Sequence, residues 1–450
     1  MPHSLLTNAL AIWHAGLAAV RSDQLVRDAL RVEGPLLLIG GDEIPLCDLR
    51  RIAVVGAGKA GAGMAAAVEE ILGPQLAAEK QLTGWINVPA DCVRPLKWIR
   101  LHAARPAGVN EPTAAGAAGA AEILRLVESL TPDDLCLCLL SGGGSALLPA
   151  PVEAISLDDK LAVTRHLSAA GANIEQLNTV RKQLSRIKGG GLARACCAGR
   201  LVSLVISDVL GDPLDLIASG PTVEDTSTPE AALAILRQFS ARQAGISPAV
   251  FQWLERPQPL TGGGRQTPSC RVTNLVIGNN ATAVDAAGME AERRGYSHAM
   301  ISARQSEGPA EEVGRHLAAM ARQMRGQSGP DCLISGGEPV VQLVEAARRG
   351  RGGRNQQLAL AALETFWDDG ASNVAFLAAG TDGEDGPTDA AGAFFDAGIL
   401  QAARQAGLSP QDFLARNDAY NFFAPLDALL KTGPTHTNVC DLRVVIARRT

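Results

Sequence analysis

Hydrophobic and polar positions along the chain repeat one order: a short apolar run, a glycine-rich turn, and then a longer amphipathic stretch. Short apolar runs bounded by glycine are typical of buried strands, and the stretches between them have the length and spacing of helices. Strands that alternate with helices predict an α/β fold with a parallel sheet covered on both faces. The expected strands are Ile52–Val55, Leu82–Val88, Leu135–Leu140, Leu201–Ile206, Leu275–Ile277, Cys332–Ile334 and Val374–Ala378.

The chain is long enough for more than one domain, because 450 residues correspond to about two or three domains of ordinary size. A segment rich in proline and glycine, residues 255–271, is the clearest linker. We therefore expect one α/β lobe over residues 1–254 and a second region over residues 272–450. Near the N-terminus, Leu5, Ala9, Trp13 and Leu17 recur every four residues, which predicts an amphipathic helix and not an export signal.

Composition narrows the classes of function. Apolar residues make up 46% of the chain and the net charge is -6, so a basic surface for nucleic acid is not expected. No apolar run approaches the roughly 18 residues of a membrane span. The nine cysteines lack zinc-ligand spacing with histidine, which favours reduced thiols in the cytoplasm. A cytoplasmic enzyme or small-molecule-binding protein remains.

The first glycine turn, Gly56-Ala57-Gly58-Lys59-Ala60-Gly61, has the form G-x-G-x-x-G between a strand and a helix. Gly56 and Gly58 let the backbone approach a ligand, and the helix N-terminus offers N–H groups to phosphate. A dinucleotide site also requires an acid at the end of the second strand, and Leu82–Val88 ends without one. Lys59 within the loop suits a phosphoryl group better, and a tight turn with an exposed lysine is the alternative.

Three further segments are candidates for ligand binding. Ser141-Gly142-Gly143-Gly144-Ser145 is a strand-to-helix turn that either forms a nest of N–H groups or is simply a flexible turn. The run Asn178–Leu192 contains four basic residues, among them Arg181 and Lys188 on one expected helical face; it is either an anion site or a solvated charged face. Gly278-Asn279-Asn280 ends another expected strand, so Asn279 and Asn280 join the candidates.

Two acidic segments also follow expected strands. Asp208 and Asp212 are four residues apart, which suits Mg²⁺, and carboxylates that cap a turn are the alternative. Asp382 and Asp385 lie in a denser cluster that lacks the spacing of a calcium-binding loop. Either cluster is a candidate for the metal site or for the general base.

Arginines and glycines mix in Arg348–Asn355, just before an apolar helix. Arg354 in this loop is a natural phosphate clamp, and an RNA-binding tract is the alternative. Glu338 adds an acid at another strand end. Taken together, these segments favour phosphoryl transfer, although the chain has neither a P-loop motif nor a protein-kinase catalytic loop.

These motifs resemble those of the glycerate 2-kinase family, the type with a C-terminal MOFRL domain. The matching segments occur in family order over nearly the whole chain: Gly56–Gly61, Ser141–Pro149, Leu177–Leu192, Ser207–Thr222, Gly278–Ala281, Ser335–Pro339, Gly352–Gln356, Gly380–Thr388, Asn417–Tyr420 and Thr432–Asp441.

The resemblance implies a kinase that uses ATP and Mg²⁺ to make 2-phospho-D-glycerate. It implies a larger Rossmann-like lobe, a smaller MOFRL lobe over about residues 331–445, and an active site in the cleft. The family's loop lysine falls on Lys59 and its GGRNQ arginine on Arg354. With the segments above, we expect catalytic roles for Lys59, Arg354, Asp208 and Asp382; ligand contacts from Gly56, Gly58, Ser141, Gly142, Gly143, Gly144, Ser145, Lys188, Asn279, Asn280 and Glu338; and metal contacts from Asp208, Asp212 and Asp385.

The chain departs from the family pattern at several positions. Gln357 replaces the usual glutamate after GGRNQ, His102–Gly108 replaces GHPxPD, and His436 and Cys440 alter the C-terminal motif. A kinase for a related hydroxy acid therefore stays open. So does an NAD(P)H-dependent hydroxypyruvate reductase, a label that members often carry, and a non-catalytic sugar-phosphate sensor. We expect no nucleic acid or membrane partner, and leave a homo-oligomer open.

Overall fold

The computed structural model describes residues 4–256 and 269–449. Contacts divide these residues into two units that are not contiguous in sequence. Unit 1 takes residues 4–21, 208–211 and 278–449, and unit 2 takes residues 22–207, 212–256 and 269–277. Most of the linker predicted at 255–271 lies outside the described residues, so that linker and the domain limits drawn from it stay predictions.

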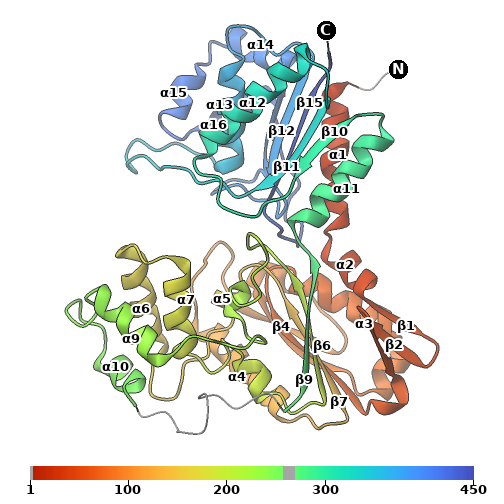
Figure 1. Ribbon diagram of the computed structural model, residues 1–450, viewed down its shortest axis with the longest axis vertical. Helices are drawn as coiled ribbons and strands as arrows, with labels where there is room; N and C mark the ends of the chain where they lie inside the picture. Colours follow the sequence, from red (N-terminus) through yellow and green to blue (C-terminus); the bar gives the residue numbers. More distant parts are fainter. Residues whose placement is uncertain (1–3, 257–268, 450) are drawn as a thin grey trace. The chain divides into compact units, whose positions relative to one another are not determined.

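Unit 2 is built on a six-stranded sheet of order β6-β5-β4-β7-β8-β9 (Figure 1). The ladders that join β6, β5, β4, β7 and β8 are parallel. Doubly wound dinucleotide-binding sheets have this order. In them the chain adds strands on one side of its first strand and then adds the remaining strands on the other side. The reversal lies between β4 and β7. The strands are β4 (Arg51–Ala57), β5 (Thr83–Pro89), β6 (Ile99–Arg105), β7 (Asp134–Leu140), β8 (Arg200–Ile206) and β9 (Arg271–Gly278).

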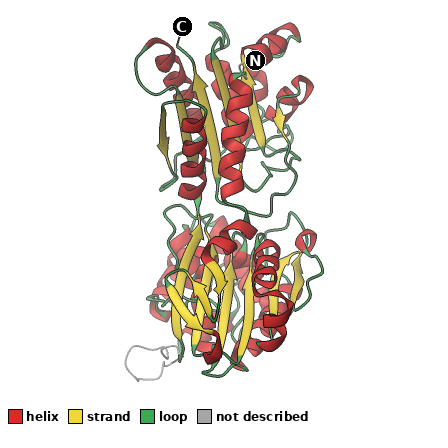
Figure 2. Cartoon of the chain, turned by 90° about the vertical axis from the view of Figure 1, so that its right-hand side faces the viewer, coloured by secondary structure: helices red, strands yellow, loops and turns green. Residues whose placement is uncertain are grey.

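Helices pack against this sheet (Figures 1 and 2), and a separate helical layer lies beside it (Figure 1). α3 packs against β4 and β5, and α4 packs against β5 and β6. The separate layer, formed by α6, α7, α9 and α10, has its own apolar cluster around Val163, Val180 and Phe251. The helices are α2 (Ser22–Ala29), α3 (Gly61–Glu79), α4 (Ala114–Glu128), α5 (Gly144–Leu147), α6 (Leu157–Ala169), α7 (Ile174–Gln183), α8 (Gly191–Ala195), α9 (Pro229–Gln238) and α10 (Pro248–Leu254).

The close contact of α3 with the sheet explains the small residues at its start. A Cβ at Gly61 would lie 2.9 Å from Cγ2 of Ile86 on β5, which is closer than real Cβ atoms come to other carbons. A three-stranded antiparallel sheet and three short 3₁₀ turns complete unit 2. They are β1 (Leu30–Glu33), β2 (Leu36–Ile39), β3 (Asp42–Pro45), η1 (Leu46–Asp48), η2 (Ala90–Cys92) and η3 (Ile217–Ser219).

Unit 1 contains a second six-stranded sheet, of order β10-β11-β15-β12-β13-β14. Only its β10–β11 ladder is parallel, and the others are antiparallel. The helices α1 and α11 cover one face, and α12 and α13 cover the other (Figure 1). The strands are β10 (His298–Ile301), β11 (Cys332–Gly337), β12 (Val374–Gly380), β13 (Gly392–Asp396), β14 (Leu429–Leu430) and β15 (Asp441–Ala447). The helices are α1 (Leu5–Ala19), α11 (Asn280–Arg293), α12 (Ala310–Gly326), α13 (Arg354–Thr365), α14 (Ala397–Gln405), α15 (Pro410–Leu414), α16 (Ala419–Phe423) and η4 (Ala424–Leu426).

The structure confirms the α/β class and the parallel sheet, and it corrects the second sheet. The runs Cys332–Ile334 and Val374–Ala378 are strands as predicted, but β15 runs antiparallel between them. The sequence pattern does not reveal this, because a strand buried on both faces looks equally apolar in either direction. The expected N-terminal helix is α1. All nine cysteines are free, and no helix in the described ranges is long and apolar enough to cross a membrane.

Candidate active site

Two of the predicted glycine loops lie side by side where the strand order of unit 2 reverses. The loop after β4 and the loop after β7 are joined by hydrogen bonds: the amide of Lys59 donates to the carbonyl of Gly142 at 3.0 Å, and the amide of Ala60 donates to Oγ of Ser141 at 3.0 Å. Ligands of open α/β sheets bind beyond the carboxyl ends of the strands at such a reversal. The fold thus brings the Lys59 and Ser141–Ser145 segments to one place.

The glycines of the first loop are required by packing. Gly56 and Gly58 have φ angles of 157° and 146°, and Cβ atoms there would lie 2.0 Å from the carbonyl oxygen of Leu139 and 2.0 Å from Oγ of Ser141. At these two positions β4 and its loop come so close to β7 and its loop that a side chain would not fit, which explains why both residues are glycine. Their predicted role in ligand binding stays a prediction.

A further cation joins this loop pair. A Cβ added at Gly143, whose φ is 78°, would lie 3.0 Å from Nη2 of Arg105 and 4.0 Å from Cγ of Lys59. Arg105 ends β6 and is buried, and its position falls in the stretch where the family motif is altered. Sequence reasoning missed Arg105, although an arginine at a strand end just before Pro106 was a usable signal.

Lys188 also contacts the second glycine loop. Its Nζ donates to the carbonyl oxygen and to Oγ of Ser145, both at 2.7 Å, and to Oγ of Ser219 at 3.4 Å. Burial, together with the charges of Lys160 and Arg181, lowers the pKa of Lys188 well below its usual value. Lys188 is only 3% exposed, so it is not part of a solvated face.

The expected helical face through Arg181 and Lys188 is not formed. α7 ends at Gln183, and Lys188 lies beyond that end, in a turn that does not continue the helix. The glycines at 189 and 190, with φ angles of 53° and 73°, continue that turn. Helical periodicity was therefore the wrong template for this segment.

In unit 1, strand register brings several acidic residues to one edge of the sheet. Asp441, the first residue of β15, lies opposite Gly337 of β11 and Gly380 of β12. Glu338 and Asp382 follow these two glycines closely, so the ends of both strands meet the start of β15. Asp441 is fully buried and was not among the predicted residues.

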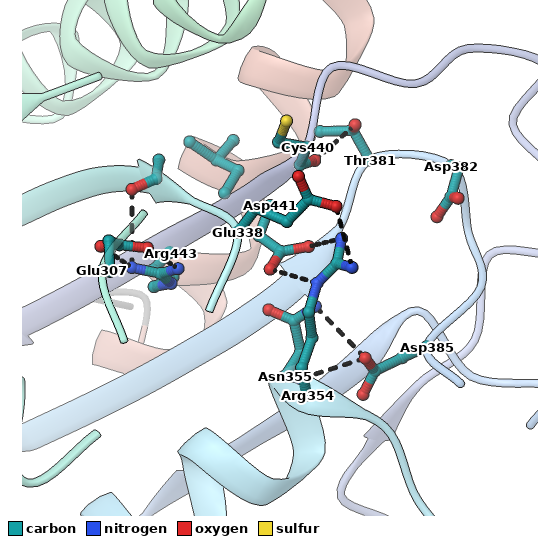
Figure 3. Close-up of polar contacts among 12 residues, drawn as sticks. Glu307, Glu338, Arg354, Asn355, Thr381, Asp382, Asp385, Cys440, Asp441 and Arg443 are labelled. Atoms are coloured by element: carbon teal, nitrogen blue, oxygen red, sulfur yellow. Dashed lines mark hydrogen bonds and ion pairs between the residues drawn. The ribbon is translucent and has the colours of Figure 1, made fainter. Parts of the chain in front are cut away.

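Arg354 is held by this acidic edge (Figure 3). Its Nε and Nη2 donate to the two carboxylate oxygens of Asp441 at 2.8 and 2.9 Å, and its Nη1 lies 3.3 Å from Oε1 of Glu338. Burial lowers the pKa of the Arg354 guanidinium, but the charge and hydrogen bonds of Asp441 outweigh burial and raise that pKa above its usual value. Burial raises the pKa of Glu338, against the effect of Arg354.

Asp385 closes the N-terminus of α13 (Figure 3). Its two carboxylate oxygens accept from the amides of Asn355 and Gln356 at 3.0 and 2.8 Å. Burial raises the pKa of Asp385 to about 7, although these backbone hydrogen bonds lower it. A buried carboxylate whose oxygens both accept from amides fits a structural role, and its predicted metal contact stays a prediction.

The other predicted acids are partly exposed. Asp208 belongs to unit 1, where Nδ2 of Asn438 donates to its carboxylate at 3.1 Å. Asp212 belongs to unit 2 and has a φ of 56°. Asp382 accepts from the amide of Glu384 at 3.2 Å. Across residues 4–256 and 269–449, no three His, Cys, Asp or Glu side chains are grouped in a way that would hold a metal ion.

The two predicted asparagines both support local structure. Asn279 caps α11 through a capping box with Thr282. Nδ2 of Asn280 donates to the carbonyls of Val439 and Asp441 at 2.9 and 3.0 Å. These contacts tie α11 to the start of β15, and the predicted ligand contacts of both residues stay predictions.

The chain is similar to known proteins in both sequence and structure. Residues 8–255 match the model described as "Domain of unknown function (DUF4147)", and residues 331–441 match the MOFRL family. Glycerate kinase of Danio rerio is 37% identical, and D-glycerate 2-kinase of Thermotoga maritima is 36% identical, each over 98% of both chains. The chain belongs to the glycerate kinase family. The crystal structure of the Thermotoga maritima glycerate kinase has a TM-score of 0.83 and 35% identity, over 99% of this chain and 100% of that one.

Membership of the glycerate kinase family confirms the resemblance drawn from the motifs. One relative, from Agrobacterium vitis, carries the name "Putative hydroxypyruvate reductase" at 38% identity over 88% of this chain and 99% of its own. The reductase label noted above therefore recurs among relatives of this chain.

The altered glycerate kinase motif at Gln357 has a local explanation. Nε2 of Gln357 donates to Oε1 of Glu311 at 2.9 Å and to the carbonyl of Leu414 at 3.1 Å. Gln357 is buried, and a glutamate in its place would bring a second carboxylate to Glu311 and lose both donors. Among the other departures, His436 is exposed and Cys440 donates through Sγ to the carbonyl of Asp208 at 3.2 Å.

Proposed function

We propose that this chain transfers the γ-phosphoryl group of ATP to the 2-hydroxyl of D-glycerate and releases ADP and 2-phospho-D-glycerate. One geometric observation carries the proposal: the Lys59 loop and the Ser141–Ser145 loop are hydrogen-bonded together at the reversal of strand order, with Arg105 beside them. Cations and backbone amides at such a place suit phosphate groups. Full-length similarity to glycerate kinases supports this choice of chemistry.

The reaction requires one bond to form and one to break. The 2-hydroxyl oxygen of glycerate bonds to the γ-phosphorus, the bond from that phosphorus to the β–γ bridging oxygen breaks, and ADP leaves. The hydroxyl proton goes to a carboxylate base, for which Asp382 and Asp208 are the candidates. Lys59 would stabilise the charge that develops on the transferred group, and Arg354 is proposed as a second cation for the phosphates.

Mg²⁺ would arrive with ATP, and would neutralise charge on the phosphate oxygens. Magnesium keeps several waters and takes only one or two carboxylates, so a preformed cage is not required. Asp208, Asp212 and Asp382 are partly exposed, as ligands of an arriving ion must be, and they fit this role better than buried Asp385. The proposal places the enzyme in the cytoplasm and leaves its oligomeric state open.

The test is a product assay with the full chain. The enzyme is incubated with Mg-ATP and D-glycerate, and the product is identified by phosphorus and proton NMR, with L-glycerate and glycerol as control acceptors. We expect 2-phosphoglycerate with matching release of ADP. Formation of 3-phosphoglycerate, or no ADP above the level without acceptor, would reject the proposal.

A reductase is the second candidate, because the G-x-G-x-x-G loop is present and one relative is named for that activity. The geometry disfavours it. An acid that binds the ribose of NAD is expected at the end of the second strand, and β5 ends in Asn87-Val88-Pro89. Oxidation of NADH or NADPH by hydroxypyruvate, followed by absorbance, separates the two activities.

A further inference from the structure

Three cationic side chains of unit 2 lie close together: Lys160 on α6, Arg181 on α7, and Lys188 just beyond α7. α7 packs against α6 (Figure 1) and against η3, and η3 packs against α5, which carries Ser145. The charges of Lys160 and Arg181 both act on Lys188, so the three groups share one region. Like charges repel one another, and grouping them away from water is unfavourable without an anion among them.

Lys160 is the clearest sign that a ligand is expected here. This residue is 8% exposed, and its Nζ neither reaches solvent nor makes a hydrogen bond to any described residue. Burial and the charge of Arg181 lower the pKa of Lys160 to about 7. Buried polar groups in folded proteins are nearly always hydrogen-bonded, so a buried amine without a partner requires an explanation.

Arg181 is partly exposed and also lacks a described partner, whereas its sequence neighbour Lys182 has two. Within the described parts of the chain, Arg181 has neither a hydrogen bond nor an ion pair, and burial lowers its pKa. By contrast, Nζ of Lys182 lies 3.3 Å from Asp215 and 3.8 Å from buried Asp225. The fold therefore supplies carboxylates to Lys182 and none to Arg181 beside it.

Hydroxyl and amide groups adjoin the cations. Lys188 donates to Oγ of Ser145 and Ser219, and Oγ of Ser219 donates to Oδ1 of Asn178 at 3.0 Å. Ser145 ends the loop that contacts the Lys59 loop, so this region continues the candidate phosphate site. A small molecule with an anionic group at one end and hydroxyls beside it matches this set of donors and acceptors.

We propose that Lys160, Arg181 and Lys188 form an oxyanion site that binds the carboxylate of the phosphoryl acceptor. The inference rests on the proposed function for the identity of that acceptor, D-glycerate. The three cations would then distinguish glycerate from a neutral polyol such as glycerol, which has the hydroxyls but no charge. Lys160 and Arg181 become substrate-specificity residues, and Lys188 joins the carboxylate to the Ser145 loop.

The test compares Lys160→Met and Arg181→Met with Arg165→Met. Arg165 lies on the same helix as Lys160, but it is 62% exposed and pairs with Glu111, so it is a matched control. Binding of D-glycerate to each full-length protein is measured by calorimetry without nucleotide. A lost charge-assisted hydrogen bond weakens binding by roughly 10- to 100-fold, so we expect that loss in Lys160→Met and Arg181→Met and none in Arg165→Met.

Steady-state kinetics provide the second measurement. KM for D-glycerate should rise about as much as the dissociation constant, while KM for Mg-ATP stays within about twofold. Unchanged glycerate binding in Lys160→Met would overturn the inference. A rise in KM for Mg-ATP in place of that for glycerate would also overturn it and assign the site to nucleotide phosphate.

Two further measurements keep the test independent of folding and of the kinase assay. Lys160→Arg retains the charge, so it should bind glycerate far better than Lys160→Met if the methionine variant loses binding through the site. Competition of wild-type glycerate binding by inorganic phosphate, and not by glycerol, is expected of an oxyanion site. These binding experiments need no ATP, so they judge the site even if no phosphoglycerate is formed.

Discussion

The pairing of Arg354 with Asp441 gives the sharpest prediction about unit 1. Asp441→Asn keeps the shape of the side chain but removes its charge and replaces one acceptor oxygen by an amide donor. Two charge-assisted hydrogen bonds, at 2.8 and 2.9 Å, then become at most one. The new amide N–H group would face the guanidinium, which also has only donors. The two donors would repel each other at the buried end of the pair.

The magnitude follows from the burial of the two partners. Breaking a fully buried pair costs about 3–5 kcal/mol, but the side chain of Arg354 is 33% exposed and keeps Glu338 as a neighbour. We therefore expect a loss of about 2 kcal/mol, close to one charge-assisted hydrogen bond. In a domain of about 150–250 residues, this corresponds to a fall in Tm of roughly 4–8 °C.

Differential scanning calorimetry measures the stability, and steady-state kinetics measures the function. Asp441 positions Arg354, so kcat should fall more than KM rises if Arg354 acts on the reacting phosphates. Glu338→Gln is the matched control, because Glu338 is 43% exposed and its longer contact should contribute less than about 1 kcal/mol.

A double variant distinguishes a specific pair from general damage. Arg354→Met leaves Asp441 buried and charged without its partner, so it should be less stable than the double variant Arg354→Met/Asp441→Asn. Additive losses in the double variant would refute the reasoning, as would an Asp441→Asn protein with the stability and kcat of the wild type.

Further outcomes are expected at Lys59, at Gly58 with Gly171 as its control, and at Lys160. Lys59→Met should lower kcat by about 10²–10³ with little change in Tm, because one stabilising cation is lost from the phosphoryl site; near-normal turnover would mean that Lys59 serves the turn alone. Gly58→Ala should destabilise the protein by about 2 kcal/mol or more in urea unfolding, since its Cβ would lie 2.0 Å from Oγ of Ser141. Gly171→Ala, where φ is 84° and no atom lies within 4 Å, should cost only about 1 kcal/mol. Because the pKa of Lys160 falls to about 7 on folding from a usual 10.5, the unfolded chain binds more protons between these values, and stability should rise with pH across that window. Lys160→Met should flatten the rise, and an unchanged pH profile of urea unfolding would contradict the buried amine.

The sequence by itself determined the fold class, the family and the loops that matter. Alternation of short apolar runs with helical stretches predicted the α/β architecture, because burial on both faces of a parallel sheet leaves a local signature. The segments around Lys59, Ser141–Ser145 and Arg354 stood out for the same reason: glycines and charges at strand ends are visible in a few consecutive residues. These segments occur in the same order as in the glycerate 2-kinase family, and this order indicated glycerate kinase chemistry.

Only the tertiary structure decided what each charged residue touches. The antiparallel course of β15, and with it the meeting of Asp441 and Arg354, depends on register between strands more than 60 residues apart in sequence, for which no local pattern exists. Asp385 became the buried acceptor for the start of α13, and Lys160 became a buried amine beside two other cations, because packing sets burial and partners. The sequence shows the sign of each charge and its position along the chain. The energy of that charge depends on its exposure to water and on the groups beside it, and both are set only when the chain folds.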